Sequence, residues 1–363
     1  MIDVRSLQLD QQRRQIFISD IHASLDLLKK LLRKVNYTYE DYLFINGDLC
    51  DKGKNSLEVI HFVRELTLKS DRVFVTKGNC DILHRYVYEG HEGIYDYMKN
   101  RKETLLNEML EIHGKTLDDF SHIKGLSEFY YQNFKEELEW LDSLPVGYET
   151  DEFLMIHAGI NRTLEQTDQT TALQIPSFYE KGHSEDKVII VGHWPVVNYR
   201  FNNVCSNNPM IDFDKRIIAI DGGNTVKRDG QLNALIVENK DYSYTYVDSL
   251  TDKSYIKTDY TPPEDVVGTV SYPYYEVTIL QENEYFTLCK NDQLNVEQWI
   301  KNEYLSSRNG NKATSKSVST TLLSVKAKEE VYLLDDKCEG YSLVKKQSGE
   351  IGWVPKDYLE IRL

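Results

Sequence analysis

The segment QIFISDIH, residues 15–22, joins a short apolar run to the polar residues Asp20 and His22. Two more apolar runs, DYLFINGD (41–48) and DRVFVTKGN (71–79), end in polar residues in the same way. The connecting segments SLDLLKKLLRKV (24–35) and NSLEVIHFVREL (55–66) repeat their apolar residues with helical spacing. This alternation predicts a βαβαβ unit, in which parallel strands are joined by right-handed crossovers.

The strand pattern returns after a segment rich in Leu, Tyr and Glu at about 94–144, which we predict to be a helical insertion. Five further strands are expected in EFLMIHAGI (152–160), DKVIIVGHWPV (186–196), KRIIAIDGG (215–223), LNALIVEN (232–239) and YSYTYVDS (242–249). We therefore predict one α/β domain over residues 1–250.

Composition excludes several classes of function. The 363 residues include 43 Lys plus Arg against 58 Asp plus Glu, a net charge of −15. Such a field repels nucleic-acid backbones and anionic membranes, although local metal ions can still attract a small phosphorylated substrate. No apolar run approaches the length of a membrane span, and the five cysteines show no CxxC spacing. We expect a cytoplasmic protein without a disulfide framework.

The C-terminal third has a different organisation. Residues 251–265, with Pro262-Pro263, are predicted to be a linker. Beyond it, the segment 276–305 aligns with 330–359: Glu-Val opens both, and Trp, Tyr and Leu keep their spacing near the end of both. We predict two small all-β barrels, at 266–308 and 318–363, with a flexible joint between them.

The polar residues at the ends of the expected strands form one set of chemical groups. They are Asp20, His22, Asp48, Asp51, Asn79, His157, His193 and Asp221. Each alone is an ordinary helix cap or turn residue, but open α/β sheets collect such residues at one edge. Imidazole, carboxylate and amide ligands together suit Mn, Fe or Zn. The pattern therefore predicts two metal ions that act on a phosphoryl group.

These motifs resemble the calcineurin-like metallophosphoesterases, closest to the bacterial Ser/Thr phosphoprotein phosphatase branch. The matching runs are SDIHA, GDLCDKG, GNCD, HAG and GHW, within about residues 14–248. The resemblance implies a sandwich of two β-sheets flanked by helices. It also implies that Asp20, His22 and Asp48 hold one metal, and that Asp48 bridges to a second metal held by Asn79, His157 and His193. A hydroxide between the two ions would attack phosphorus.

Two residues depart from the family pattern. Cys80 replaces a family histidine that pairs with the aspartate at position 51 and either protonates the leaving oxygen or orients the phosphate. Lys52 replaces an arginine that binds phosphate through a bidentate fork. A thiol is a poorer proton donor than an imidazolium, and an ammonium lacks the bidentate fork of a guanidinium. We expect Asp51, Lys52 and Cys80 in the catalytic machinery, with Cys80 neither a ligand nor a nucleophile. The arginines that follow the motifs are candidate substrate contacts: Arg85, Arg162 and Arg200.

The end of the chain, SGEIGWVPKDYLEI (348–361), resembles the last strands of an SH3 domain. That resemblance implies a peptide ligand for the second repeat, through Pro355 and Tyr358. The alternative is an intramolecular ligand, in which the repeats pack onto the first domain, or self-association of the chain.

Three functions follow from these resemblances. The first is hydrolysis of phosphoserine or phosphothreonine in proteins, as the order of the motifs indicates. The second is a phosphodiesterase that acts on nucleotide-like diesters, which Cys80 and Lys52 favour, because a diester carries less charge on phosphorus. The third is a low-turnover metal-binding scaffold that acts through the SH3-like repeats. A substrate panel of monoesters, diesters and a phosphopeptide discriminates among them.

Overall fold

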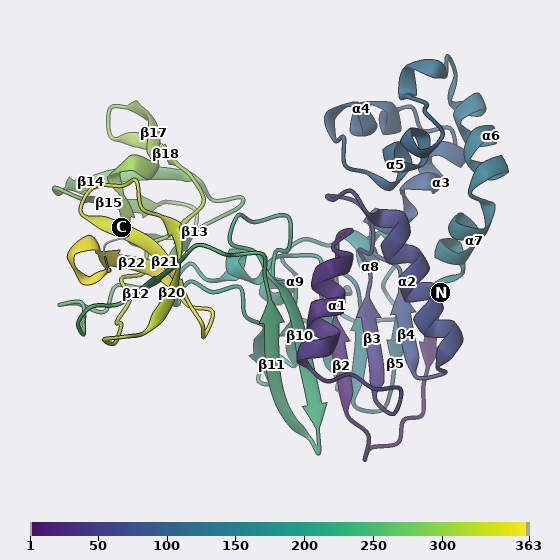
Figure 1. Ribbon diagram of the computed structural model, residues 1–363, viewed down its shortest axis with the longest axis horizontal. Coiled ribbons are helices and arrows are strands. Elements are labelled where there is room, and N and C mark those ends of the chain that lie inside the picture. The colour runs from purple at the N-terminus through teal and green to yellow at the C-terminus, as the bar shows by residue number, and fades with distance from the viewer. Residues whose placement is uncertain (1, 361–363) are drawn as a thin grey trace. The chain divides into compact units, whose positions relative to one another are not determined.

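The computed structural model describes residues 2–360 and divides them into two compact units (Figure 1). The first unit runs to Pro195 and resumes over Pro209–Asp248. The second unit combines Val196–Asn208 with the chain from Ser249 onward. The main division lies between Asp248 and Ser249, and the predicted boundary is at residue 250. The excursion of Val196–Asn208 into the second unit was not expected.

One sheet of the first unit contains the predicted βαβαβ strands. Its order is β11-β10-β2-β3-β4. Its strands are β2 (Gln15–Ile18), β3 (Tyr42–Asn46), β4 (Val73–Thr76), β10 (Leu232–Glu238) and β11 (Asp241–Val247). The neighbours β2, β3 and β4 are parallel, as predicted, whereas β10 runs antiparallel to β2 and β11 antiparallel to β10.

The second sheet of the first unit has the order β1-β5-β6-β7-β9-β8. Its strands are β1 (Val4–Ser6), β5 (Gly147–Glu149), β6 (Phe153–Ile156), β7 (Val188–Val191), β8 (Met210–Asp212) and β9 (Ile217–Ala219). The predicted strands β6, β7 and β9 are parallel neighbours. The edge strands β1, β5 and β8 are only three residues long, too short for a recognisable apolar pattern.

The two sheets share one apolar layer. Phe17 of β2 stacks on Phe44 of β3 with ring centroids 4.6 Å apart, and Phe153 of β6 meets Phe17 edge-on at 5.2 Å. Neighbouring residues such as Ile16 and Leu43 point to the opposite face and pack in a second core with the helices. Because side chains alternate along a strand, a sheet covered on both faces has continuously buried strands, as β2 and β3 do.

Helices cover the outer face of the first sheet and form the insertion. The sheet is covered by α1 (Leu25–Lys34) and α2 (Ser56–Lys69), and α1 buries Leu25, Leu28, Leu31 and Leu32 on one stripe. The insertion contains η1 (Cys80–Ile82), α3 (Leu83–Tyr88), α4 (Gly93–Asn100), α5 (Leu105–Ile112), η2 (Leu117–Asp119), α6 (Ile123–Asn133) and α7 (Lys135–Ser143). Helical structure thus begins directly after Asn79, earlier than the predicted start near residue 94. Among the described residues, no helix combines the length and apolar character that crossing a bilayer requires.

The second unit is built from strands, apart from short 3-10 turns. The strands are β12 (Lys253–Tyr255), β13 (Thr269–Val270), β14 (Glu276–Glu282), β15 (Phe286–Asn291), β16 (Val296–Lys301), β17 (Leu305–Asn309), β18 (Lys312–Ser315), β19 (Val318–Ser319), β20 (Glu330–Asp335), β21 (Tyr341–Lys346) and β22 (Ile351–Pro355). The repeated segments have matching structure: β14-β15-β16 and β20-β21-β22 are antiparallel meanders, each followed by a 3-10 turn, η4 (Asn302–Tyr304) or η5 (Lys356–Tyr358). Each meander has a register shift at the same place, Ile279/Gln281 and Leu333/Asp335.

The predicted linker and joint contain strands. Strand β12, inside the expected linker 251–265, pairs antiparallel with β20 of the second repeat. Strand β18 lies beyond the expected end of the first repeat at residue 308 and pairs with β14. Both strands are short and mostly polar, so their sequences show no alternation of apolar and polar residues. Backbone hydrogen bonds to a neighbouring strand hold them in place. Residues 361–363 of the predicted second repeat lie outside the described residues.

Candidate metal centre

The predicted ligands occupy the first positions after parallel strands. Asp20 and His22 follow β2, Asp48 follows β3 and Asn79 follows β4 in one sheet. His157 follows β6 and His193 follows β7 in the other sheet. Several of them have left-handed backbone conformations, with φ of 54° at Asp20, 47° at His22, 50° at Asp48 and 65° at His193. Such conformations are unfavourable for residues other than glycine and concentrate at functional sites.

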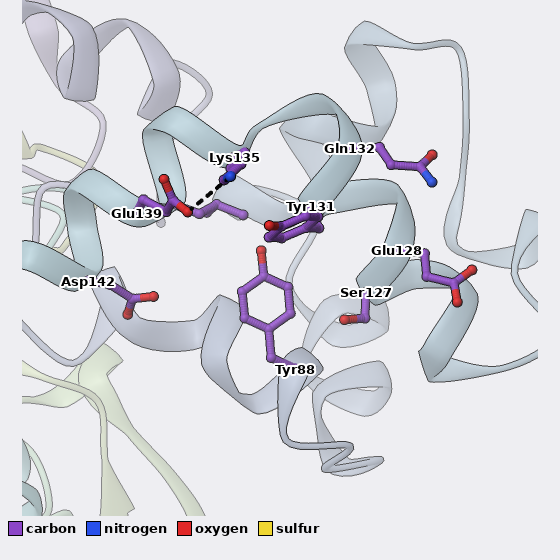
Figure 2. A pocket seen from close by; sticks show the side chains of 9 residues that line it. Tyr88, Ser127, Glu128, Tyr131, Gln132, Lys135, Glu139 and Asp142 are labelled. Carbon is purple, nitrogen blue, oxygen red and sulfur yellow. Dashed lines mark ion pairs between the residues drawn. The ribbon is translucent and has the colours of Figure 1, made fainter.

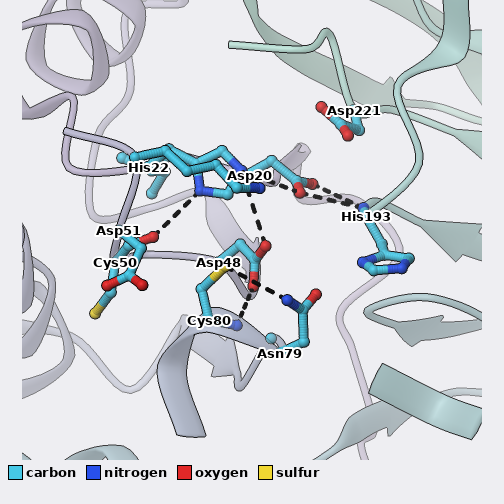
Figure 3. A network of polar contacts seen from close by, with 12 residues as sticks. Asp20, His22, Asp48, Cys50, Asp51, Asn79, Cys80, His193 and Asp221 are labelled. Atoms are coloured by element: carbon cyan, nitrogen blue, oxygen red, sulfur yellow. Dashed lines mark hydrogen bonds and ion pairs between the residues drawn. The ribbon is translucent and has the colours of Figure 1, made fainter. Parts of the chain in front are cut away.

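Asp48 lies at the middle of the group (Figure 3). Its Oδ2 is 3.8 Å from His22 Nε2, and its Oδ1 is 3.4 Å from His157 Nε2. On the first side, Asp20 Oδ1 lies 3.8 Å from His22 Nε2. On the second side, Asn79 Oδ1 lies 3.2 Å from His157 Nε2, and His193 completes a group with Asp48 and His157 whose ligand atoms all lie within 4.8 Å of one another. The geometry therefore brings all six predicted metal ligands together.

Backbone carbonyls orient two of the imidazole rings. His22 Nδ1 is 3.2 Å from the carbonyl oxygen of Cys50, and His157 Nδ1 is 2.9 Å from that of Asn46. A carbonyl oxygen only accepts, so each Nδ1 is the donor and each Nε2 keeps its lone pair. The rings therefore present Nε2 to the carboxylates, as metal-binding histidines do.

Two glycines show how closely the carboxylates are packed. A Cβ atom at Gly78 would lie 2.2 Å from Asp48 Oδ1, and one at Gly192 would lie 2.3 Å from Asp20 Oδ2. Real Cβ atoms do not approach other atoms so closely, so only glycine fits at either position. These glycines give the space in which the ligand oxygens converge, and the site fits a metal pair in both its donor set and its crowding.

Burial sets the charges of the ligands. It lowers the pKa of His22 and of His193 to about 3, so both rings are neutral. Burial, reinforced by the nearby Asp48 carboxylate, raises the pKa of Asp20 to about 7. Burial would also raise the pKa of Asp48, but the Lys52 ammonium and the backbone N–H of Cys80 hold it below its ordinary value. Neutral imidazoles beside an ionised carboxylate present lone pairs and negative charge to a cation.

Lys52 and Cys80 lie beside the predicted first metal position. Lys52 Nζ is 3.1 Å from His22 Nε2. The thiol of Cys80 belongs to a group with His22 and Asp48 whose ligand atoms lie within 4.8 Å of one another. Burial, with the Asp48 carboxylate, raises the pKa of the Cys80 thiol well above its usual range. Cys80 also donates its backbone N–H to Asp48 Oδ1 at 2.8 Å, so it helps to hold the central carboxylate.

The Asp51 carboxylate is bonded to the helical insertion. Among the described residues, no hydrogen bond joins its carboxylate to Cys80. Its Oδ1 accepts the N–H of Leu105 at 2.7 Å, and its Oδ2 accepts the hydroxyl of Tyr97 at 2.8 Å. Both partners belong to the helical insertion or its loops, so Asp51 ties the insertion to the metal-binding loop. Burial raises the pKa of Asp51 to about 7, although both hydrogen bonds oppose the rise.

The three candidate arginines lie in different surroundings. Arg85 lies on α3, close behind Cys80, and its Nε is 3.6 Å from Asp142 Oδ1. Arg162 is exposed on a loop after β6. Arg200 belongs to the second unit and donates to the carbonyl of Asn208 at 3.1 Å. Of the three, only Arg85 lies on a helix that follows a predicted ligand directly, because η1 begins after Asn79 and α3 follows η1.

Sequence reasoning missed a carboxylate that organises the loops. Asp81 is buried, and its Oδ1 accepts the N–H groups of Leu49 and Cys50 at 2.9 and 3.1 Å. Its Oδ2 accepts the N–H of Gly78 at 2.8 Å. These bonds join the loops after β3 and β4 and hold Asp48 and Asn79 in place. The GNCD run contained the signal, because a buried turn aspartate commonly accepts backbone N–H groups.

Comparisons with known proteins show the family of this chain. The family profile described as Calcineurin-like phosphoesterase matches residues 13–220, more than half of the chain. The symmetrical bis(5'-nucleosyl)-tetraphosphatase of Vibrio parahaemolyticus is 34% identical over 158 residues, which cover 43% of this chain and 47% of that protein. The asymmetrical bis(5'-nucleosyl)-tetraphosphatase of Halalkalibacterium halodurans is 29% identical over 152 residues, covering 39% of this chain and 56% of that protein.

Among solved structures, a candidate diadenosine tetraphosphatase aligns with a TM-score of 0.46 and 16% identity, over 69% of this chain and 100% of that chain. The chain spans about half the length of the curated relatives described above.

Proposed function

The chain belongs to the calcineurin-like phosphoesterase family, and on that premise we propose that it is a metal-dependent hydrolase of nucleotide-type phosphodiesters or phosphoanhydrides. The observation that carries this proposal is the position of Asp48 between His22 and His157, at 3.8 and 3.4 Å, with a thiol at the place of the family's general acid. Two ions in such a ligand set, when bound, activate a water molecule and neutralise phosphate charge.

The residues of the site have separate roles in this proposal. Asp20, His22 and Asp48 would hold one ion, and Asp48, Asn79, His157 and His193 the other. Lys52 supplies a buried positive charge beside His22, where it can stabilise a phosphoryl oxygen. Asp81 and the carbonyls of Asn46 and Cys50 keep the ligands in position without touching the substrate.

The leaving group distinguishes the substrate classes. When water attacks phosphorus, the bond to the leaving oxygen breaks, and that oxygen needs a proton only if it is strongly basic. The buried Cys80 thiol is a weak donor, and the Asp51 carboxylate faces Tyr97 and Leu105 instead of supporting it. A nucleoside phosphate leaves as a weakly basic anion and does not require that donor. The similarity to bis(5'-nucleosyl)-tetraphosphatases supports the same substrate class.

A second candidate is hydrolysis of phosphoserine or phosphothreonine in proteins. The order GDLCDKG, GNCD, HAG and GHW along the chain favours it. Both candidates use the same metal ligands, so only the substrate separates them. The scaffold alternative is less well supported, because a protein without turnover has no need for six converging ligands.

The deciding experiment is a substrate panel with Mn²⁺ added. We expect kcat/KM for diadenosine tetraphosphate and bis-p-nitrophenyl phosphate to exceed that for a phosphoserine peptide. Asp48→Asn is the matched inactive control, because it keeps the size of the side chain and removes its charge. A phosphopeptide preference would replace the first candidate by the second, and no turnover of any ester above the Asp48→Asn background would refute both.

For the second unit we propose an SH3-like architecture with a peptide or intramolecular ligand. Trp353 is fully buried and donates to the carbonyl of Ser319 at 2.8 Å, so it belongs to the core and not to a groove. Tyr358 is half-buried beside Tyr260, with ring centroids 4.9 Å apart, and could form part of a recognition surface. Titration with a proline-rich peptide, followed by amide chemical shifts, tests this idea. Shifts that bypass Tyr260 and Tyr358 would contradict it.

A further inference from the structure

A hollow of about 270 Å³ lies between α3 and α8 (Gln169–Gln174) in the first unit. Its lining includes Ile82 from η1, Arg85 from α3 and Glu89 just after α3. Gln169 and Gln174 of α8 line the other side. This volume is at the lower limit for a small-molecule pocket, so it suits part of a ligand more than a whole one.

Both walls of the hollow are fixed to ligands of the predicted second metal. The wall formed by η1 and α3 begins at the residue after Asn79. In the opposite wall, the backbone of Gln174 lies near the His193 ring and opposes the lowering of its pKa by burial. The carbonyl of Ala172 accepts the N–H of Ala158, the residue after His157, at 2.9 Å. The hollow is therefore lined by elements that adjoin the loops carrying Asn79, His157 and His193.

The lining offers the groups that bind a nucleotide. The Arg85 side chain is 41% exposed and approaches one carboxylate, Asp142 Oδ1, at 3.6 Å, so it keeps donors for a phosphate. The Tyr86 hydroxyl accepts from Gln174 Nε2 at 3.4 Å, and its ring is half-buried. Its aromatic face can stack on a base, and the amides of Gln169 and Gln174 can pair with polar atoms of a base or sugar.

A larger hollow of about 410 Å³ has the opposite character (Figure 2). It lies on the insertion, where Tyr88 and Tyr131 are accompanied by three carboxylates, Glu128, Glu139 and Asp142. Its lysine, Lys135, already pairs with Glu139 at 3.6 Å. This lining has three carboxylates and one lysine, whereas the hollow between α3 and α8 has one carboxylate, Glu89, and one arginine, Arg85. The larger hollow therefore repels phosphate more strongly than the smaller one.

From these contacts we propose that the hollow between α3 and α8 binds the nucleotide half of the substrate that leaves on hydrolysis, with Arg85 on its phosphate and Tyr86 against its base. The inference rests on the proposed function and adds to it a specificity site. It makes Arg85 and Tyr86 substrate-binding residues that distinguish a nucleotide from a simple phosphate ester.

The test measures binding and turnover with the full-length, Mn²⁺-loaded protein. Calorimetry with ADP and with inorganic phosphate compares a ligand that reaches the hollow with one that does not. Arg85→Gln and Tyr86→Leu should each weaken ADP binding by about tenfold relative to phosphate binding. They should lower the ratio of kcat/KM for diadenosine tetraphosphate to that for p-nitrophenyl phosphate by a similar factor.

The matched control is Arg64→Gln. Arg64 is also a helical, half-exposed arginine paired with one carboxylate, Glu136, at 3.4 Å, but it lies on α2, and the lining of the hollow does not include it. Arg64→Gln should leave the ratio of the affinity for ADP to the affinity for phosphate as in the wild type. Circular dichroism spectra of all variants establish that they are folded.

The outcomes separate the inference from the proposed function. Equal effects of Arg85→Gln and Arg64→Gln on ADP binding overturn the inference, and wild-type turnover of diadenosine tetraphosphate would then leave the proposed function intact. Conversely, ADP binding that depends on Arg85, in a protein that hydrolyses only phosphopeptides, supports the nucleotide site and overturns the proposed function.

Discussion

Replacing Cys80 by histidine tests which ester this site can cleave. The thiol is buried, and it lies close to the ligand atoms of His22 and Asp48. An imidazole at this position can donate a proton to a basic leaving oxygen, which the thiol does poorly. We therefore expect Cys80→His to raise hydrolysis of alkyl phosphomonoesters relative to diesters.

The size of the gain follows from the surroundings of residue 80. General acid catalysis contributes about 10²–10⁴-fold, and a well-oriented donor is needed for the upper part of that range. Asp51 would have to orient the new ring, but its two oxygens already accept from Leu105 and Tyr97. A larger side chain in a packed site also strains its neighbours, typically by about 1–3 kcal/mol. We therefore expect a gain of about 10²-fold, at the low end.

The assay compares kcat/KM for an alkyl phosphate, p-nitrophenyl phosphate and bis-p-nitrophenyl phosphate at fixed Mn²⁺. The gain should be largest for the alkyl phosphate, because its leaving oxygen is the most basic. Cys80→Ala is the control that removes the thiol without adding a donor, and it should keep both the metal content and the diesterase rate.

Two results would refute this reasoning. If Cys80→Ala loses a metal ion, the thiol is a ligand, which its position beside His22 and Asp48 allows. If Cys80→His is folded and metal-loaded but accelerates all three substrates equally, proton donation to the leaving group is not what residue 80 controls.

Three further predictions follow. Asp48→Asn should abolish hydrolysis and lower the metal content measured by mass spectrometry, whereas Asp20→Asn should keep more of its activity and more of its metal. Two tightly bound ions in Asp48→Asn would contradict the bridging role. Burial raises the pKa of Asp51 from 3.8 to about 7, so between these pH values the folded protein holds a proton that the unfolded chain releases. The metal-free protein should therefore lose stability as pH rises through this range, and Asp51→Asn should remove up to about 4 kcal/mol of that pH dependence. Urea unfolding at several pH values measures it, and the same pH dependence in Asp51→Asn would rule the assignment out. A chain ending at Asp248 should aggregate, because it exposes Val197 and Cys205, which belong to the core of the second unit. The same chain with residues 196–208 replaced by a short Gly-Ser linker should be monomeric in size-exclusion chromatography and should cleave p-nitrophenyl phosphate. Equal solubility of the two chains would show that the exposure of these core residues is unimportant.

The sequence by itself predicted a group of polar residues at strand ends, and the family resemblance predicted which six of them bind metal. Each of them follows a strand whose apolar pattern is readable locally, as in QIFISD before His22 or EFLMI before His157. Parallel strands bring their carboxyl ends to one edge, so residues far apart in the chain meet without any further signal. The βαβαβ unit therefore followed from periodicity and order, and the repeat in the second unit followed from spacing. The six ligands stay a prediction that rests on the family resemblance.

Only the tertiary structure decided how these groups are held and what surrounds them. The partners of Asp51 are Tyr97 and Leu105, which lie 46 and 54 positions away in the insertion. Strand β12 exists because β20 offers it backbone hydrogen bonds, and the hollow beside Arg85 exists because α8 packs opposite α3. Hydrogen bonds and packing between distant segments depend on where the chain brings them together, and no local pattern of residues records that.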